Sequence, residues 1–373
     1  MSPRADLSPM HLPPTPQELT VNLDAATFPL NAWYVAGWDA EIGRKLLPRT
    51  ICDHDIVLYR KLDGQAVALA DSCWHRLLPL SEGRLVGDEL VCGYHGLRFN
   101  ETGRCTHMPS QETLNPSACV RSYPVVERHR FVWVWPGDPA QADPALIPDL
   151  GWFDDPAWVG DGRMTPVKAD YRLVIDNLMD LTHETFVHSS SIGNEALTEA
   201  PFDAFHGERT ATVERWVLDA EAPPFWAAQL GRPGPVDRWQ YIYFLSPAVV
   251  VLDVGVAVAG TGAPLGDRSQ GVSMWVVHIP TPSTKNTCYY FWCHLRNYKL
   301  HDQGLTRRIM EAASGILKED EDVIESQQRA LERNPGRGFN NLNIDAGSLW
   351  ARRRIDAMIA QEQPRAIRLV QAA

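Results

Sequence analysis

Short runs of apolar residues, broken by turn residues, fill the chain from residue 31 to residue 135. The runs are rich in β-branched and aromatic side chains, which is typical of strands joined by tight connections. The clearest lie at residues 56–59, 66–69, 90–91 and 131–135. This pattern predicts a small β domain. A stretch dense in Pro, Asp and Ala follows at 137–148 and predicts a linker.

Longer apolar and aromatic runs return in the second half of the chain and predict a larger sheet. They lie at residues 239–244, 249–258, 274–279 and 289–295. Apolar residues then recur at helical spacing over 305–331 and 349–359, so we expect helices to close the chain and to pack on that sheet. The fold class expected is α+β. The polar, proline-rich residues 1–28 predict a tail or an arm on a partner subunit.

Composition and charge narrow the possible functions. The 373 residues carry a net charge of −11, with a pI near 5.5, so nucleic-acid binding is not expected. No apolar run approaches the length that crosses a bilayer, and the first residues lack the apolar core of a signal peptide, which favours a cytoplasmic protein. Seven cysteines, an odd number in a long chain, do not indicate a disulfide framework and are compatible with metal binding.

The segment 177–188 places imidazoles and a carboxylate in an otherwise apolar, helix-like run. Buried polar groups of this kind are costly unless they are paired, and a metal ion would pair them. His183 and His188 are five residues apart, about 140° around an ideal helix, so both can bind one ion only if the helix ends or bulges between them. The zinc-protease spacing is one residue shorter. Two histidines and one distant carboxylate suit non-haem iron(II). The alternative is a pair of satisfied core histidines.

A second candidate site combines two cysteine and histidine pairs in the β domain. Cys73 and His75 are followed after sixteen residues by Cys92 and His95. Two thiolates and two imidazoles fit either a tetrahedral zinc site or a Rieske [2Fe-2S] centre. A zinc finger groups its cysteines first and its histidines second. Here each predicted loop offers one ligand to each of two irons, which favours the Rieske centre. Structural zinc remains the alternative.

With these residues the chain resembles the Rieske non-haem iron ring-hydroxylating and demethylating oxygenases. Trp74 stands where that family usually has proline, which would change hydrogen bonding or solvent access at the cluster. High-potential Rieske proteins add a cysteine to each loop, and this chain lacks both, so the low-potential type fits better. The other five cysteines are expected to be buried thiols; they are Cys52, Cys105, Cys119, Cys288 and Cys293.

The resemblance implies a Rieske domain at 29–150 and a helix-grip catalytic domain at 151–373. It also implies that His183, His188 and Asp320 bind mononuclear iron, with Glu319 and Asp322 as rivals for the third position. Asp180 is expected to hydrogen-bond His183 and a Rieske histidine, His75 or His95, of a neighbouring subunit, in a homotrimer. Asn177 is expected to face the same site as a weak ligand or a neighbour of the ligands.

Electrons are expected to come from a separate reductase carrying flavin, NAD(P)H and an iron–sulfur cluster. The glycine-rich segment 260–266 does not have the spacing of a dinucleotide fingerprint, Pro264 would interrupt the helix that such a site needs, and no strand–helix unit surrounds it. We therefore expect this segment to be a loop.

Within the oxygenases, the chain is most similar to the oxygenase components of vanillate O-demethylases and their neighbours. The stretches that carry this likeness are 31–36, 176–185, 222–226 and 342–347. The likeness implies that dioxygen is used to convert a methoxylated aromatic acid into a phenol and formaldehyde. It also implies that His278 and Asp253 face the aromatic ring. Methyl hydroxylation, ring dihydroxylation, N-demethylation and a non-catalytic Rieske electron carrier remain alternatives.

Overall fold

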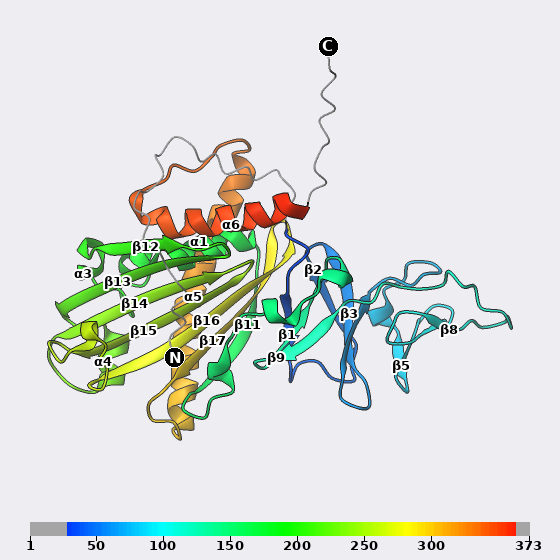
Figure 1. Cartoon of the computed structure of the whole chain (residues 1–373), viewed down its shortest axis with the longest axis horizontal. Helices are drawn as coiled ribbons and strands as arrows, with labels where there is room; N and C mark the ends of the chain where they lie inside the picture. The colour runs from blue at the N-terminus through cyan, green and yellow to red at the C-terminus, as the bar shows by residue number, and fades with distance from the viewer. Residues whose placement is uncertain (1–27, 363–373) are drawn as a thin grey trace, which may run out of the picture.

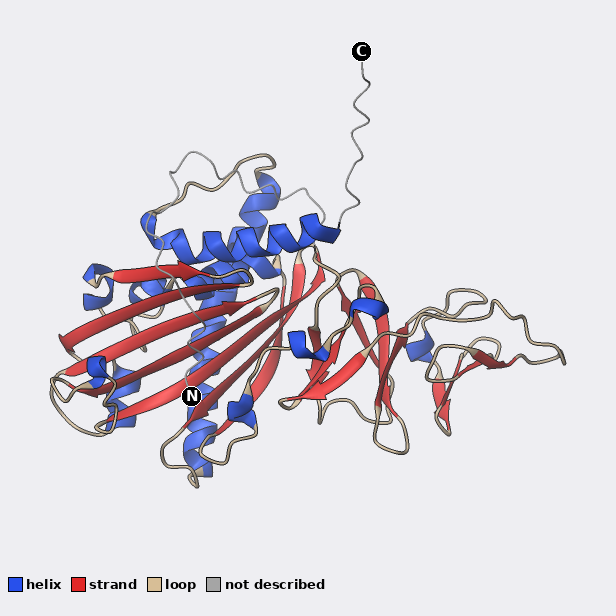
Figure 2. Cartoon of the chain, in the orientation of Figure 1, coloured by secondary structure: helices blue, strands red, loops and turns tan. Residues whose placement is uncertain are grey.

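The computed structural model describes residues 28–362 and divides them between small sheets and one large sheet. The small sheets contain β1–β10, and the large one contains β11–β17 with helices on one face (Figures 1 and 2). This confirms the predicted α+β fold with a Rieske-type β domain and an antiparallel sheet flanked by helices. Nearly all of the expected tail, residues 1–28, lies outside the described residues.

The first ten strands are short and pair only with antiparallel neighbours. They form a β1-β10-β9 sheet, a β2-β3-β4 sheet and a β5-β6-β7-β8 sheet. Their bounds are β1 Tyr34–Trp38, β2 Leu47–Ile51, β3 His54–Arg60, β4 Ala66–Ala70, β5 Arg84–Val86, β6 Glu89–Val91, β7 Arg98–Phe99, β8 Cys105–His107, β9 Val125–Arg128 and β10 Phe131–Val134. The strands expected at 56–59, 66–69 and 90–91 fall inside β3, β4 and β6. The strand expected at 131–135 extends one residue past β10.

The large sheet has the order β11-β17-β16-β15-β14-β13-β12, and each neighbouring pair is antiparallel. The strands are β11 Val159–Val167, β12 Phe202–His206, β13 Thr210–Ala220, β14 Val236–Leu245, β15 Val249–Val258, β16 Gly271–Thr284 and β17 Thr287–Arg296. The four predicted runs are β14 to β17. The first three strands were not predicted, because polar residues interrupt their apolar pattern. The glycine-rich segment 260–266 is a turn between β15 and β16, as expected.

Both faces of the large sheet are covered, by different parts of the chain. Along β16, Met274 and Val276 face the core formed with the helices, whereas Trp275 and Val277 face the aromatic residues of β1 and β10. Strict alternation along a strand produces this division. The opposite face therefore packs on one side of the β domain, whereas other apolar residues of that domain, such as Ile56 and Val134, join the core formed with the helices. The predicted linker also packs on the opposite face, through the buried Ile147.

The helices that cover the sheet come from three parts of the chain. They are α1 Tyr171–Met179, α2 Glu184–Val187, α3 Ala196–Glu199, α4 Pro224–Leu230, α5 Gln303–Arg333 and α6 Ala346–Glu362. The predicted C-terminal helices are α5 and α6, and α6 packs along β12 and β13. In α5 the buried residues Ala313, Asp320 and Ile324 share one stripe. None of the helices in the described part of the chain is long and apolar enough to cross a membrane.

Hydrogen bonds fix the β domain to the sheet at several points. The turn between β2 and β3 donates from the Cys52 and Asp53 amides to the carbonyls of Pro282 and Ser283, at 3.0 and 2.8 Å. The fully buried Thr281 hydroxyl donates to the Val35 carbonyl at 2.8 Å. The two halves are therefore joined by directional bonds as well as by apolar packing.

Replacing Thr281 with valine should lower the free energy of unfolding by about 1–3 kcal/mol. The substitution keeps the shape of the side chain but leaves the Val35 carbonyl buried without this donor. Chemical denaturation of the variant measures the loss. Thr113→Val, at an exposed position, is the control and should change the stability little; equal stability of Thr281→Val and the parent would contradict the role given to this bond.

Candidate active site

The segment that carries both histidines is a helix interrupted at Asp180. Helix α1 ends at Met179, because Asp180 takes an extended conformation with φ −126° and ψ 102°. Its carboxylate accepts a hydrogen bond from the Thr182 amide at 2.8 Å and so starts a new turn that contains His183. Helix α2 then ends at Val187, between the two histidines, as their spacing requires. The larger break at Asp180 was not predicted.

The loop after His188 folds back against α2. The Gly193 amide donates to the His188 carbonyl at 2.9 Å. A Cβ atom on Gly193 would lie 2.5 Å from the carbonyl oxygen of Glu184, so only glycine allows this close approach. The loop fixes the end of α2 and with it the direction of the His188 side chain.

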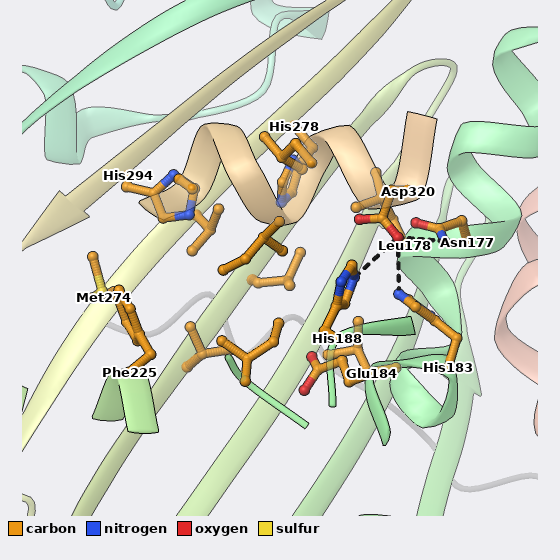
Figure 3. A pocket seen from close by; sticks show the side chains of 18 of the residues that line it. Asn177, Leu178, His183, Glu184, His188, Phe225, Met274, His278, His294 and Asp320 are labelled. Atoms are coloured by element: carbon orange, nitrogen blue, oxygen red, sulfur yellow. Dashed lines mark hydrogen bonds and ion pairs between the residues drawn. The ribbon is translucent and has the colours of Figure 1, made fainter. Parts of the chain in front are cut away.

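Three of the predicted ligands converge on one point (Figure 3). His183 Nε2 lies 3.3 Å from Asp320 Oδ1, and His188 Nε2 lies 3.0 Å from the same oxygen. One ligand atom from each residue lies within 4.8 Å of the other two, a distance set that one metal ion can span. His188 and Asp320 are buried. Two imidazoles and one carboxylate form the donor set expected for non-haem iron(II), so the residues present fit that ion.

The other nitrogen of each imidazole is engaged by a different group. His183 Nδ1 lies 2.5 Å from the main-chain carbonyl of Asp180, and His188 Nδ1 lies 2.7 Å from Glu319 Oε2. Partners of this kind orient metal-binding imidazoles. Glu319, a rival for the third ligand position, therefore contacts His188 instead of the convergence point. Asp180 contacts His183 as predicted, but through its carbonyl, because its carboxylate caps the turn at Thr182.

Charge is balanced locally at this site. Burial alone would lower the pKa of His188, but Asp320 and Glu319 raise it to about 9. The pKa of His183 is also raised, since hydrogen bonding and charge from Asp320 outweigh burial. The two imidazoles hold the pKa of the Asp320 carboxyl below its usual range against the effect of burial. Asn177 faces the same site, as predicted, and donates to Asp320 at 3.1 Å.

The convergence point opens into a pocket with mostly apolar walls. The pocket encloses about 740 Å³ of space, its open mouth included. Leu252, Val254, Met274 and Val276 line it from the sheet, and Leu317 lines it from α5. Such walls suit an aromatic ligand and keep water away from the reacting atoms.

The structure separates the two predicted substrate residues. His278 lines the pocket and is buried, and Tyr290 lies 2.7 Å from its Nδ1. The prediction for Asp253 is wrong. Its neighbours Leu252 and Val254 face the pocket, so Asp253 points to the opposite face, where it accepts from Arg268 at 2.7 Å and from the Trp239 indole at 2.9 Å.

Several pocket residues were missed from the sequence. Glu184 is buried beside His183 and accepts hydrogen bonds from Arg238 at 2.6 Å and from Gln240 at 3.0 Å. His294 also lines the pocket. The alternation of Arg238 and Gln240 with the aromatic residues Trp239 and Tyr241 along β14 is the signal that the sequence offered.

The two cysteine and histidine pairs lie in matching loops. In each loop the cysteine amide donates to the carbonyl five residues later, and the amide four residues later donates back to the cysteine carbonyl. That fourth residue, Leu77 or Gly96, has a positive φ in both loops. Cys73 and Cys92 are buried, whereas the rings of His75 and His95 are exposed, 4.6 Å apart between centroids.

This arrangement fits a diiron cluster and does not fit one zinc ion. Among the residues described, the four side chains do not bring three ligand atoms within 4.8 Å of one another, as a single ion would need. A buried thiol pair and an exposed imidazole pair instead match the two irons of a Rieske centre. Trp74, next to His75, is partly exposed. Among the remaining cysteines, Cys119 is exposed rather than buried, because it alternates with the buried Ala118 and Val120.

Fold and site together define a Rieske non-haem iron oxygenase, and comparison with known proteins agrees. Residues 32–124 match the Rieske [2Fe-2S] domain, and residues 167–361 match the vanillate O-demethylase oxygenase C-terminal domain. The chain belongs to the family of vanillate O-demethylase oxygenase components. It is an oxidoreductase, with a Rieske cluster and a mononuclear iron as its cofactors, and not an electron carrier.

The relatives support this assignment over most of the chain. The vanillate O-demethylase oxygenase subunit of Pseudomonas sp. (strain HR199 / DSM 7063) is 44% identical over 341 residues, covering 90% of this chain and 96% of the relative. The iron-sulfur subunit TsaM1 of the toluene-4-sulfonate monooxygenase system of Comamonas testosteroni is 38% identical, covering 89% and 97%. Both are subunits of larger systems, so this chain is the oxygenase component of such a system.

Solved structures agree with the fold. The crystal structure of dicamba monooxygenase bound to 3,6 dichlorosalicylic acid has a TM-score of 0.85 and 36% identity, covering 90% of this chain and 99% of that one. The structure of the same enzyme with non-heme iron and dicamba has a TM-score of 0.75 and 34% identity, with the same coverage.

Replacing Glu319 with alanine should weaken binding of the mononuclear iron about 10- to 100-fold while the cluster is retained, because His188 loses the group that orients it. Iron content and the rate of iron loss to a chelator measure the effect. Asp322→Asn, in the same acidic run but paired with Lys318 on the surface, is the matched control. Iron retention equal to that of the control would show that His188 is held without Glu319.

Proposed function

We propose that this chain is the oxygenase component of an O-demethylase acting on a methoxylated aromatic acid such as vanillate. The observation that supports the proposal best is the convergence of His183, His188 and Asp320 at the wall of an apolar pocket that also presents His278. The pocket suits an aromatic ring, and the ligand set suits iron(II) with open positions for dioxygen.

The proposed ligands are assigned as follows. His183, His188 and Asp320 hold the mononuclear iron, with Asn177 hydrogen-bonded to the carboxylate. Cys73 and Cys92 hold one iron of the cluster, and His75 and His95 hold the other. The metals supply the electron storage and the dioxygen activation, and the protein positions the substrate and excludes water.

The proposed reaction balances as a monooxygenation. The methoxy compound, dioxygen, two electrons and two protons give a hydroxymethyl ether and water. The hydroxymethyl ether then breaks its C–O bond to release the phenol and formaldehyde. The apolar walls formed by Leu252, Val254 and Met274 hold the methoxy carbon near the metal ligands. Glu184 and Arg238 neutralise each other beside them, so the pocket wall adds little net charge.

His278 is proposed to orient the substrate. The Tyr290 hydroxyl has a pKa raised far above its usual value by burial and so remains a donor to His278 Nδ1. Burial, with the neighbouring His294, lowers the pKa of His278 to about 3, so its ring is neutral. When the Tyr290 hydroxyl donates to Nδ1, the ring proton sits on Nε2. That N–H can donate to a polar group of the bound aromatic acid.

Electron transfer is proposed to cross between subunits of a homotrimer. One side of the β domain, which includes Trp133 of β10, packs on the face of the large sheet opposite to the face that lines the pocket. The end of the domain near β5 and β8 also projects away from the catalytic half (Figure 1). A cyclic assembly would bring this end to the next subunit, near Asp180.

The remaining proposals rest on the sequence analysis. The electrons are proposed to come from a reductase carrying flavin, NAD(P)H and an iron–sulfur cluster, and the system is proposed to work in the cytoplasm. The domain limits proposed are 29–150 for the Rieske domain and 151–373 for the catalytic domain.

Aerobic turnover of a panel of methoxybenzoates with a reductase and NAD(P)H should release formaldehyde and a phenol in equal amounts. Vanillate and its ring isomers form the panel, and formaldehyde and products are measured separately. A methyl-substituted benzoate and an N-methyl aromatic compound serve as comparisons. A benzyl alcohol would indicate methyl hydroxylation, a cis-diol would indicate ring dihydroxylation, and an N-demethylated product would indicate N-demethylation. Any of these without phenol formation would contradict O-demethylation.

Replacing Asp180 with asparagine should slow product formation at least about 10-fold while both metal sites stay loaded. The change removes the charge that is proposed to connect the two subunits but keeps a cap for Thr182, since an asparagine oxygen also accepts. Single-turnover product yield from a pre-reduced cluster measures the electron step. Unchanged yield, with normal iron content, would rule out this role for the carboxylate.

A further inference from the structure

Two imidazoles, not one, line the part of the pocket that lies away from the convergence point. His278 on β16 and His294 on β17 project from the same face of the sheet, because His294 pairs with Val276, two residues before His278. Their ring centroids are 6.5 Å apart at 83°. In Figure 3, His294 lies farther from Asp320 than His278 does.

One polar atom of His294, the ring nitrogen Nδ1, lacks a partner in the described part of the protein. The ring is half-buried, and its Nδ1 atom is inaccessible to water and has no hydrogen-bond partner among the described residues. His278, by contrast, is fixed by Tyr290. Buried polar atoms nearly always have partners, because leaving them unpaired is costly. A histidine that faces a ligand pocket and lacks a partner is accounted for if the ligand supplies one.

The pocket also lacks a free cation for an anionic substrate. Among its described lining residues Arg238 is the permanent cation, and it is already bound to Glu184 at 2.6 Å and to the Ile192 carbonyl at 3.0 Å. Burial lowers the pKa of His294 to about 4, so this ring is neutral like that of His278. Before an anion binds, the pocket therefore offers it N–H donors rather than a fixed positive charge.

We propose that His294 is the second donor of a two-imidazole clamp that receives the two oxygens of a substrate carboxylate or sulfonate. His278 donates to one oxygen through Nε2, and His294 donates to the other. This inference rests on the proposed function, because it assumes an aromatic acid with its methoxy group near the iron ligands. It assigns His294 as a specificity-determining residue.

Binding to the holoenzyme without turnover tests the clamp. Anaerobic calorimetric titration is performed with vanillate, with the corresponding sulfonate (4-hydroxy-3-methoxybenzenesulfonate) and with the uncharged methyl ester of vanillate. His294→Leu should weaken binding of the preferred anion about 10- to 100-fold, the usual effect of losing one hydrogen bond to a charged group, and should change ester binding by less than about twofold. The anion whose affinity falls most in His294→Leu identifies the acidic group of the natural substrate.

Two conservative variants separate recognition from packing. His294→Asn offers an amide donor near the position of Nδ1, and His294→Gln offers one near Nε2, so one of them should restore part of the anion binding. Met274→Leu, another pocket residue on the same sheet, changes packing without changing a polar group and should weaken acid and ester equally or not at all. If His294→Leu does not fold, anion and ester binding by the Asn and Gln variants still tests the clamp.

Three results would overturn the clamp. They are equal losses for anion and ester in the His294 variants, no loss in any of them, and a wild-type enzyme that binds the ester as tightly as both anions. None of these depends on formaldehyde release, which is measured on the wild type alone. Failure of the clamp and failure of the proposed O-demethylation can therefore be told apart.

Discussion

One buried carboxylate organises the catalytic half of the molecule. Asp320 comes from α5, and the two imidazoles it contacts come from a segment more than a hundred residues earlier, so the core must bring both elements to one point. These groups balance one another by hydrogen bonding and charge. The interruption at Asp180, the end of α2 and the apolar stripe of α5 all support this contact, because each sets the direction of one of the three side chains.

Much of this centre could be predicted because its signals are local. Cysteine and histidine order within two short loops distinguishes a diiron cluster from zinc, and the i, i+5 spacing of His183 and His188 requires a helix end between them. Asp320 was chosen only through family resemblance. The sequence nevertheless held a physical signal, since Asp320 lies on the buried stripe with Ala313 and Ile324, whereas Glu319 and Asp322 do not.

The failed and missing predictions concern which face of a strand a residue occupies. A strand buried on both sides gives no polar alternation to read, so Asp253 was as easily assigned to the pocket as to the outer face. The pairing of Glu184 with Arg238 and Gln240 depends on the register of distant elements, and no spacing along the chain encodes it. Three of the seven strands of the large sheet were missed for a related reason, because polar residues interrupt their apolar pattern.

The large sheet also separates the substrate pocket from the surface that packs on the β domain. Its helical face shapes the pocket, and its other face holds the β domain through apolar packing and through the bonds made by Thr281 and by the Cys52 turn. Substitutions that alter the pocket, such as those at positions 278 or 294, point away from the face that carries the domain. Substrate choice can therefore change on one face without moving the cluster, whose direction is set on the other. This division gives a physical reason why one architecture accommodates the different substrates named for its relatives.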